Sequence, residues 1–224
     1  MWRFVKQYRT LWLVLGPLAL IIVLLIYNAL NPVKRLPIYQ PAMVNKELVD
    51  STIHHQMKYH NIADFSLTNQ NGEIVTQKTF EGKIYVADFF FTTCPTICPV
   101  MTKNMAEIQA EIIDDSDILL LSHTVTPDID SVAQLKAYAY NKGVIDGKWH
   151  LVTGEKKQIY ELARKSYLAV KNDGDGGPFD MIHTENFILI DKEKRIRGFY
   201  DGTNTEDIAR LLTDIKILKT AYLD

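Results

Sequence analysis

The feature that most limits the fold of this chain is a stretch of twenty residues, 11–30, that contains no charged side chain. Twenty helical residues rise by about 1.5 Å each and so reach about 30 Å, the thickness of a bilayer core. Trp12 and Tyr27 lie near its two ends, where aromatic rings favour the membrane interface. The stretch therefore predicts a transmembrane helix that anchors everything following it.

Charge around this stretch predicts its orientation. Three basic residues precede it and two follow it, which places residues 1–10 in the cytoplasm and the rest of the chain outside. A cleaved signal peptide is the rival interpretation, but its apolar core usually has about 7–15 residues and a small-residue cleavage site close behind. We therefore expect an uncleaved anchor in a bacterial inner membrane. A mitochondrial inner membrane is less favoured, because no arginine-rich transit segment precedes the stretch.

Residues 31–61 are predicted to be a linker. Three prolines within ten residues, from Pro32 to Pro41, favour an extended spacer. The end of the segment carries side chains that could hold a metal ion such as copper loosely: His54, His55, Met57 and His60. A solvated approach to the domain is the preferred interpretation, because linker side chains lack the packing that orients ligands.

From Ile62 the pattern alternates between strands and helices. A hairpin turn at Asn71-Gly72 comes first, and the apolar run 84–91 is then typical of a central strand covered on both faces. The alternation predicts the α/β class with a mixed sheet, a thioredoxin-like fold with an N-terminal β-hairpin extension over residues 62–224. The other predicted elements are helix 95–113, strand 118–121, a helix capped at Asp130-Ser131, strand 149–152, helix 159–163, hairpin 187–199 and helix 206–221.

Composition excludes two classes of protein. The formal net charge of −2 argues against a nucleic-acid partner, which would require a basic face. The chain contains two cysteines, Cys94 and Cys98, and a disulfide scaffold would need several at wider spacing. Two cysteines so close together indicate a local chemical site.

The predicted position of the cysteine pair favours reactive thiols. Cys94 follows a buried strand, and Cys98 lies about one turn into the next helix, with Pro95 in its first turn. Residues four apart share a helix face, and a helix N-terminus stabilises thiolate. Three uses stay open: reversible oxidation, binding of a soft metal, or an inert disulfide. Redox motifs of this fold usually have two residues between the cysteines, so the three found here weaken the simple redox interpretation.

A metal would need a further ligand, and the candidate is His183. It lies in a glycine-rich loop just before the predicted strand 187–190. In a thioredoxin-like fold that loop packs beside the cysteine loop. Two thiolates and one imidazole suit Cu(I), and they also hold Cu(II) if an oxygen joins. Structural zinc would normally require a fourth protein ligand.

The chain resembles the SCO/SenC family of copper chaperones that act in cytochrome c oxidase assembly. The resemblance covers about residues 62–218 and includes a specific motif, two cysteines separated by three residues and each followed by proline. It rests on the segments ADFSLTNQNGE, GKIYVADFFFTTCPTICPVM, LSHTVTPDIDS, WHLVTG and the His183 segment that ends in LIDKEKRIRGFYDG.

The resemblance implies a function and its residues. The family's copper ligands fall on Cys94, Cys98 and His183, with one copper per domain, and the two cysteines are also expected to form a reversible disulfide. The implied role is delivery of copper to the copper A centre of the oxidase, or reduction of that centre's cysteines. Expected partners are the oxidase's copper-binding subunit and other copper carriers or thiol reductants.

The sequence departs from the family at two positions. Ile182 stands where many members have an acidic residue before the ligand histidine, so Asp180 or Glu185 would have to supply an outer carboxylate. Thr126 stands where members often have aspartate. His123, nearby, is interpreted as a strand-end residue, with a role as an extra ligand as the weaker alternative.

Four hypotheses follow. A metallochaperone, which is not an enzyme, ranks first, and it needs both cysteines and His183. A thiol–disulfide oxidoreductase ranks second, with Cys94 and Cys98 as its catalytic pair. A peroxidase ranks third, because the nearby cations are Lys83 and Lys103 and no arginine stands close to the motif. A purely structural disulfide ranks last.

Overall fold

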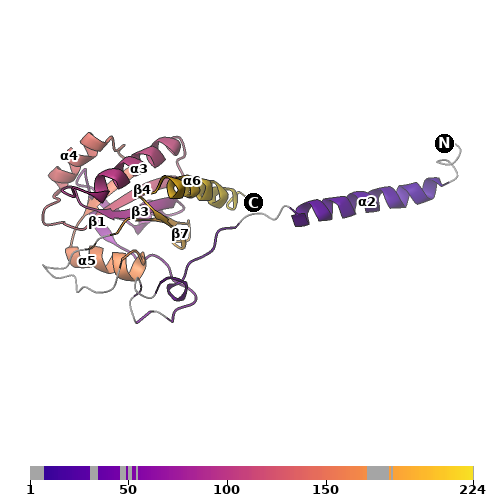
Figure 1. The fold of residues 1–224 in the computed structure, drawn as a ribbon, viewed down its shortest axis with the longest axis horizontal. Helices are drawn as coiled ribbons and strands as arrows, with labels where there is room; N and C mark the ends of the chain where they lie inside the picture. The colour runs from indigo at the N-terminus through magenta and orange to yellow at the C-terminus, as the bar shows by residue number, and fades with distance from the viewer. Residues whose placement is uncertain are drawn as a thin grey trace. The chain divides into compact units, whose positions relative to one another are not determined.

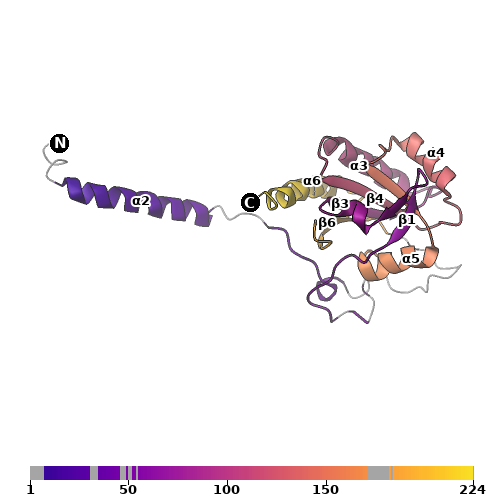
Figure 2. The same ribbon diagram turned by 180° about the vertical axis from the view of Figure 1, so that it is seen from behind.

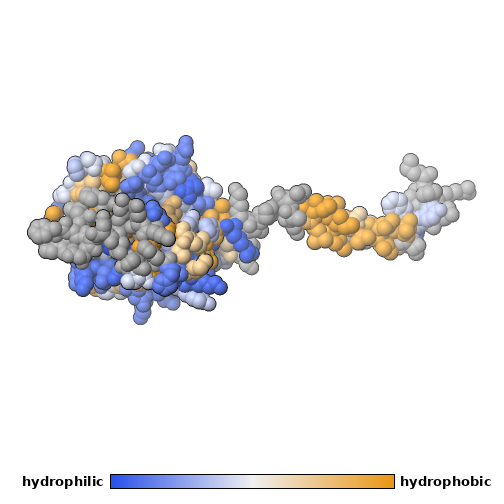
Figure 3. Space-filling model, turned by 60° about the horizontal axis from the view of Figure 1, so that its bottom comes forward, coloured by the Kyte–Doolittle hydropathy of each residue, from blue (hydrophilic) through white to orange (hydrophobic). Residues whose placement is uncertain are grey.

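The fold is given by a computed structural model that describes residues 8–30, 35–45, 49, 52–53, 55–170, 182 and 184–223. The chain divides into two compact units, Met1–Arg35 and Leu36–Asp224. The first contains helix α2 (Arg9–Leu30) (Figure 1). Its described side chains are apolar and exposed over residues 11–27 (Figure 3). None of the helices, as far as the structure describes them, combines the length and the apolar character needed to cross a bilayer.

The second unit is built on a mixed sheet, as the sequence predicts. Its seven strands in the described residues have the order β2-β1-β5-β4-β3-β6-β7. The central strands β3, β4 and β5 are parallel, and the other neighbours pair antiparallel. The strands are β1 (Ser66–Asn69), β2 (Ile74–Thr76), β3 (Ile84–Phe90), β4 (Ile118–Thr124), β5 (Trp149–Thr153), β6 (Asn186–Ile190) and β7 (Ile196–Asp201).

Helices cover both faces of this sheet. Figures 1 and 2 show α3, α4 and α6 on one face and α5 on the other. Each face has its own apolar core, because alternate residues of a strand point to opposite sides. The helices are α3 (Ile97–Glu111), α4 (Val132–Lys142), α5 (Lys156–Glu161) with a following π-helical turn η4 (Leu162–Ser166), and α6 (Thr205–Thr220); short turns η1 (Pro41–Met43) and η3 (Gln77–Phe80) complete the set.

Strand β3 positions the cysteine motif. All seven of its residues are buried, which fits the continuous apolar run and its place between β4 and β6. Val86 and Phe90 point to the α3 side, whereas Ala87 and Phe89 point to the α5 side. The chain leaves the carboxyl end of β3 at Phe90 and enters α3 at Ile97, so residues 91–96 form the loop that carries Cys94.

The second unit begins at Leu36, inside the segment predicted as a linker. We call residues 36–45 the docked segment. Tyr39 donates its N–H to the carbonyl of Ile196 in β7 at 2.9 Å. The guanidinium of Arg197 donates to the carbonyls of Leu36 and Pro37 at 2.6 and 2.8 Å. The segment packs there because β7 is an edge strand whose outer backbone groups need partners.

Candidate metal and thiol site

Both cysteines lie where the sequence predicts, between a buried strand and a helix. Cys94 is 8% exposed and Cys98 is 3% exposed, and both are free thiols. The start of the helix differs from the prediction, because α3 begins at Ile97 and Pro95 therefore precedes it. Thr96, the residue before the helix, has φ −115° and ψ −87°, outside the helical region. Cys94 thus belongs to the loop, and Cys98 belongs to the first turn of α3.

The two thiols differ in acidity. Burial raises the pKa of Cys94, but hydrogen bonds from the backbone N–H groups of Cys98 and Thr96 outweigh it and lower the pKa to about 7. Burial, with a smaller contribution from the neighbouring Cys94 sulfur, raises the pKa of Cys98 to about 12. At neutral pH a large share of Cys94 is therefore thiolate, while Cys98 keeps its proton. The predicted thiolate stabilisation holds for Cys94 and is wrong for Cys98.

The predicted third ligand, His183, lies outside the described residues, as does Asp180. Its described neighbour Ile182 is buried, and the hydroxyl of Thr184 donates to the carbonyl of Ala169 at 2.9 Å. Glu185, the other candidate for an outer carboxylate, is exposed. Within the part of the chain that the structure describes, no group of three His, Cys, Asp or Glu side chains is arranged to hold a metal. Ligation by His183 stays a prediction.

His123 is a core residue on the other side of the sheet. Its ring is 0% exposed and stacks on Phe89 with 4.8 Å between ring centroids, and Tyr167 contacts its edge. Phe89 and Tyr167 belong to the core on the α5 side, whereas the cysteines belong to the core on the α3 side. Burial lowers the pKa of His123 to about 4. The strand-end interpretation is confirmed, and this position argues against a role as an extra ligand.

The two described histidines before the domain, His55 and His60, lie in different surroundings. His60 is buried, its ring Nε2–H donates to the carbonyl of Ser166 at 2.8 Å, and its backbone N–H donates to Oε1 of Gln40 at 3.0 Å. The prediction of a solvated approach is therefore wrong for His60, because it packs against the π-helical turn η4. His55 and Met57 are exposed, and His54 lies outside the described residues.

Sequence reasoning missed the role of Asp130 beside the cysteine loop. This carboxylate is 0% exposed and accepts hydrogen bonds from Thr92, Thr124 and Thr126. The predicted cap of α4 is provided by the next residue, Ser131, whose hydroxyl accepts from the N–H of Gln134 at 3.3 Å. The signal in the sequence is the position of the threonines, which lie at or just after the carboxyl ends of the adjacent strands β3 and β4.

A second buried carboxyl, Asp88, lies in β3 on the cysteine side of the sheet. It is 2% exposed, and its Oδ1 has no hydrogen-bond partner among the described atoms. Burial raises the pKa of Asp88 to about 7, although the hydroxyl of Ser122 opposes this. Its negative charge also helps to raise the pKa of Cys98.

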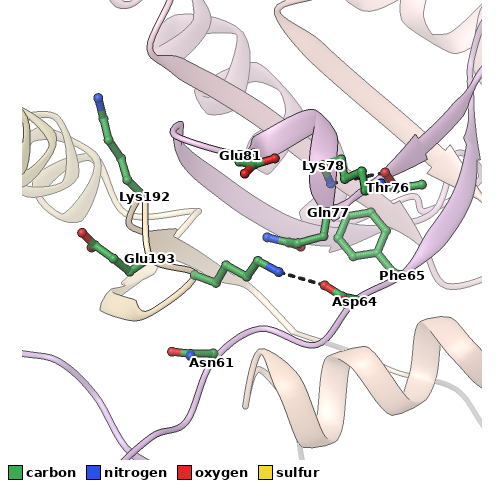
Figure 4. Close-up of a pocket in the computed structure, with 10 residues that line it drawn as sticks. Asn61, Asp64, Phe65, Thr76, Gln77, Lys78, Glu81, Lys192 and Glu193 are labelled. Carbon is green, nitrogen blue, oxygen red and sulfur yellow. Dashed lines mark hydrogen bonds and ion pairs between the residues drawn. The ribbon is translucent and has the colours of Figure 1, made fainter.

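A cavity of about 760 Å³ lies at the other end of β3, between η3 and the turn that joins β6 to β7. Figure 4 shows Asp64 next to the ring of Phe65. Asp64 forms an ion pair with Lys194, 2.8 Å long. The remaining lining residues are mostly polar or charged, and neither cysteine is among them. The cavity is therefore separate from the thiol site.

Comparisons with known proteins support the resemblance seen in the sequence. The sequence model of the family described as SCO1/SenC matches residues 54–219. A SCO1/SenC family lipoprotein from Bacillus anthracis is 31% identical, with a TM-score of 0.63 and coverage of 71% of this chain and 95% of that chain. A second structure, described as identifying a disulfide switch in BsSco, a member of the Sco family of cytochrome c oxidase assembly proteins, is 30% identical. Its TM-score is 0.62, with coverage of 72% of this chain and 94% of that chain.

A third structure contains the metal that the sequence suggests. ScoI of Arabidopsis thaliana, solved with copper bound, is 25% identical with a TM-score of 0.54, and the match covers 69% of this chain and 97% of that chain. These similarities confirm the thioredoxin-like fold that the alternation of strands and helices predicts. Because the family match extends over well more than half of the sequence, the chain belongs to the SCO1/SenC family.

Proposed function

We propose that this chain is a membrane-anchored metallochaperone that binds copper and delivers it to the copper A centre of cytochrome c oxidase during assembly. The observation that carries the proposal is the pair of free, nearly buried thiols at the start of α3. The relatives add support, because one is solved with copper and another belongs to a family of oxidase assembly proteins. The expected partner is the oxidase's copper-binding subunit.

The residues present fit copper as cargo. The proposed ligands are the sulfurs of Cys94 and Cys98 and the imidazole of His183, one copper per domain. Soft thiolates select Cu(I), which accepts low coordination, and the same set holds Cu(II) when an oxygen joins. Because the pKa of Cys98 is raised to about 12, binding must release its proton, and copper affinity should rise with pH.

The test is copper stoichiometry of the full chain purified in detergent, with the thiol groups reduced. Wild type should bind one copper and show a thiolate-to-Cu(II) absorption band. Cys94→Ser, Cys98→Ser and His183→Ala should each lose the band. His55→Ala is the matched control, since His55 is exposed and outside the proposed ligand set. An unchanged band in His183→Ala would remove that residue from the ligand set.

Thiol–disulfide exchange is the second candidate function, and the unequal acidity of the thiols favours it. Cys94, with its pKa lowered to about 7, suits attack on a partner disulfide, and Cys98 would then displace the partner from Cys94. The products are a reduced partner and a Cys94–Cys98 disulfide, so two electrons leave the protein. His183→Ala should keep this activity. Disulfide reduction by a wild type that binds no copper would favour this second function over the first.

We propose that residues 11–30 anchor the protein in a bacterial inner membrane, with residues 1–10 in the cytoplasm and residues 62–224 on the periplasmic side. Support comes from the twenty uncharged residues and from the Bacillus anthracis relative, which is described as a lipoprotein. The cysteines of this chain are Cys94 and Cys98, so a peptide helix would replace a lipid here. Extraction of the wild type from membranes by alkaline carbonate would contradict the anchor.

A further inference from the structure

The loop that carries Cys94 needs support from outside itself. Residues 91–96 belong to neither β3 nor α3, and fixing each residue of such a loop costs conformational entropy. The amide of Cys94 donates to the carbonyl of Phe91 at 3.3 Å, a long hydrogen bond. The thiols can act together as a pair provided that this loop stays in place.

Asp130 supplies contacts that hold the loop. Its Oδ1 accepts from the hydroxyl of Thr92 at 2.5 Å, and its Oδ2 accepts from the backbone N–H of Thr92 at 3.2 Å. The same Oδ2 accepts from the hydroxyls of Thr124 and Thr126, the latter at 3.0 Å. A buried carboxylate therefore joins the cysteine loop to the end of β4 and to the loop before α4.

The side chain of Asp130 faces the cysteine loop and does not cap α4. Ser131 caps α4, so the carboxylate of Asp130 is free to face the cysteine loop instead. Its hydrogen-bond partners in the described residues are three threonines, and hydrogen bonds to a charged acceptor are about twice as strong as neutral ones. Both bonds to the cysteine loop end on Thr92, two residues before Cys94. Rotation of the backbone at Thr92 would therefore displace the Cys94 sulfur.

We propose that Asp130 is a positioning residue, whose carboxylate fixes Thr92 and thereby keeps the sulfur of Cys94 within reach of Cys98. The inference rests on the proposed function, because it concerns the same pair of thiols. Asp130 touches neither sulfur in the described contacts and acts through the loop. Without it, the two sulfurs would spend less time at the separation that a shared metal or a disulfide requires.

The test is the equilibrium of the full chain with glutathione. One molecule of glutathione disulfide oxidises Cys94 and Cys98 to a disulfide, and two molecules of reduced glutathione are released. Asp130→Asn and Thr92→Val should lower this equilibrium constant about tenfold, equivalent to about 30 mV in reduction potential, because the loosened loop separates the thiols. A loss of stability that affected the dithiol and disulfide forms equally would leave the constant unchanged.

Ser131→Ala is the matched control. It removes the neighbouring cap of α4 and leaves the hydrogen bonds from Thr92 to Asp130 in place. Its glutathione equilibrium should stay within twofold of wild type. If Thr92→Val and Asp130→Asn also keep the wild-type constant, the proposal is wrong and Asp130 supports the fold alone.

Two features keep this test decisive. Should Asp130→Asn fail to fold, Thr92→Val decides the matter, because it removes one hydroxyl and keeps the carboxylate. The glutathione equilibrium is measured without copper, so it is independent of the copper stoichiometry experiment. A wild type that forms the disulfide in glutathione but binds no copper in the stoichiometry experiment would contradict the proposed function and leave this inference intact.

Discussion

Two carboxyl groups are buried beside the cysteine loop, and their surroundings are opposite. Asp130, in the loop before α4, accepts four hydrogen bonds from three threonines. Asp88, in β3, has an Oδ1 without a partner among the described atoms, and burial raises its pKa to about 7. Asp130 is 0% exposed and Asp88 is 2% exposed, so the two groups are almost equally buried. The difference between them therefore comes from their hydrogen-bond partners. The first is an acceptor that holds a loop, and the second is a carboxyl that favours its neutral form.

The largest expected effect on folding stability comes from the neutral form of Asp88. Its pKa is 3.8 in the unfolded chain and about 7 when folded, so the folded protein keeps a proton that the unfolded chain loses. Stability should therefore fall as pH rises from about 4 to 7, by up to about 4 kcal/mol at about 1.36 kcal/mol per pKa unit. Asp88→Asn, which stays neutral, should be more stable than wild type at pH 8.

Urea unfolding of the reduced full chain at several pH values checks this expectation. The advantage of Asp88→Asn should shrink toward zero near pH 4, where both side chains are neutral. Other groups that titrate, such as His123, are common to both proteins and cancel in the difference. Parallel stability curves for the two proteins would show that Asp88 does not carry the pH dependence.

The matched change at the other carboxyl, Asp130→Asn, should lower the stability of the protein, whereas Asp88→Asn should raise it. Asp130→Asn replaces an acceptor oxygen with a donor, so threonine hydroxyls and the Thr92 amide lose part of their partner. Removing one partner from buried polar groups costs about 1–3 kcal/mol, and we expect a loss near about 3 kcal/mol at pH 8. The measurement is the same urea titration. If both asparagine variants were more stable than wild type, or both less stable, the contrast drawn between Asp88 and Asp130 would be wrong.

A smaller effect is expected when a single donor to Asp130 is removed. Thr126→Val deletes one of the four hydrogen bonds and keeps the size of the side chain. The expected loss is about 1 kcal/mol, because the other three donors remain. A shift in the urea midpoint measures it. A loss as large as that of Asp130→Asn would mean that Thr126 alone holds the carboxylate.

The sequence predicts the cysteine site better than it predicts these carboxyls. The position of Cys94 and Cys98 between strand and helix follows from local patterns, an apolar run followed by helical spacing. Asp88 lies within the same apolar run, and its charge state depends on partners that come from other strands. Asp130 stands before a serine at a helix start, so the pattern indicates a cap, and its bonds to Thr92 form across 38 positions of sequence.

The packing of the docked segment against β7 could not be predicted from the sequence either. Its prolines indicate a free spacer, but its partners, Ile196 and Arg197, lie about 160 residues further along the chain. A contact of this kind leaves no local periodicity to detect. The same holds for His60, which contacts the carbonyl of Ser166 across 106 positions.

The docked segment also shortens the tether of the domain. Between the end of α2 at Leu30 and its first docked residue, Leu36, only residues 31–35 remain. Fully extended, five residues reach at most about 18 Å, against roughly 100 Å for the whole span 31–61. A tether this short limits the volume that the second unit can explore about the end of α2, so a partner held near that end meets the thiols at a high effective concentration.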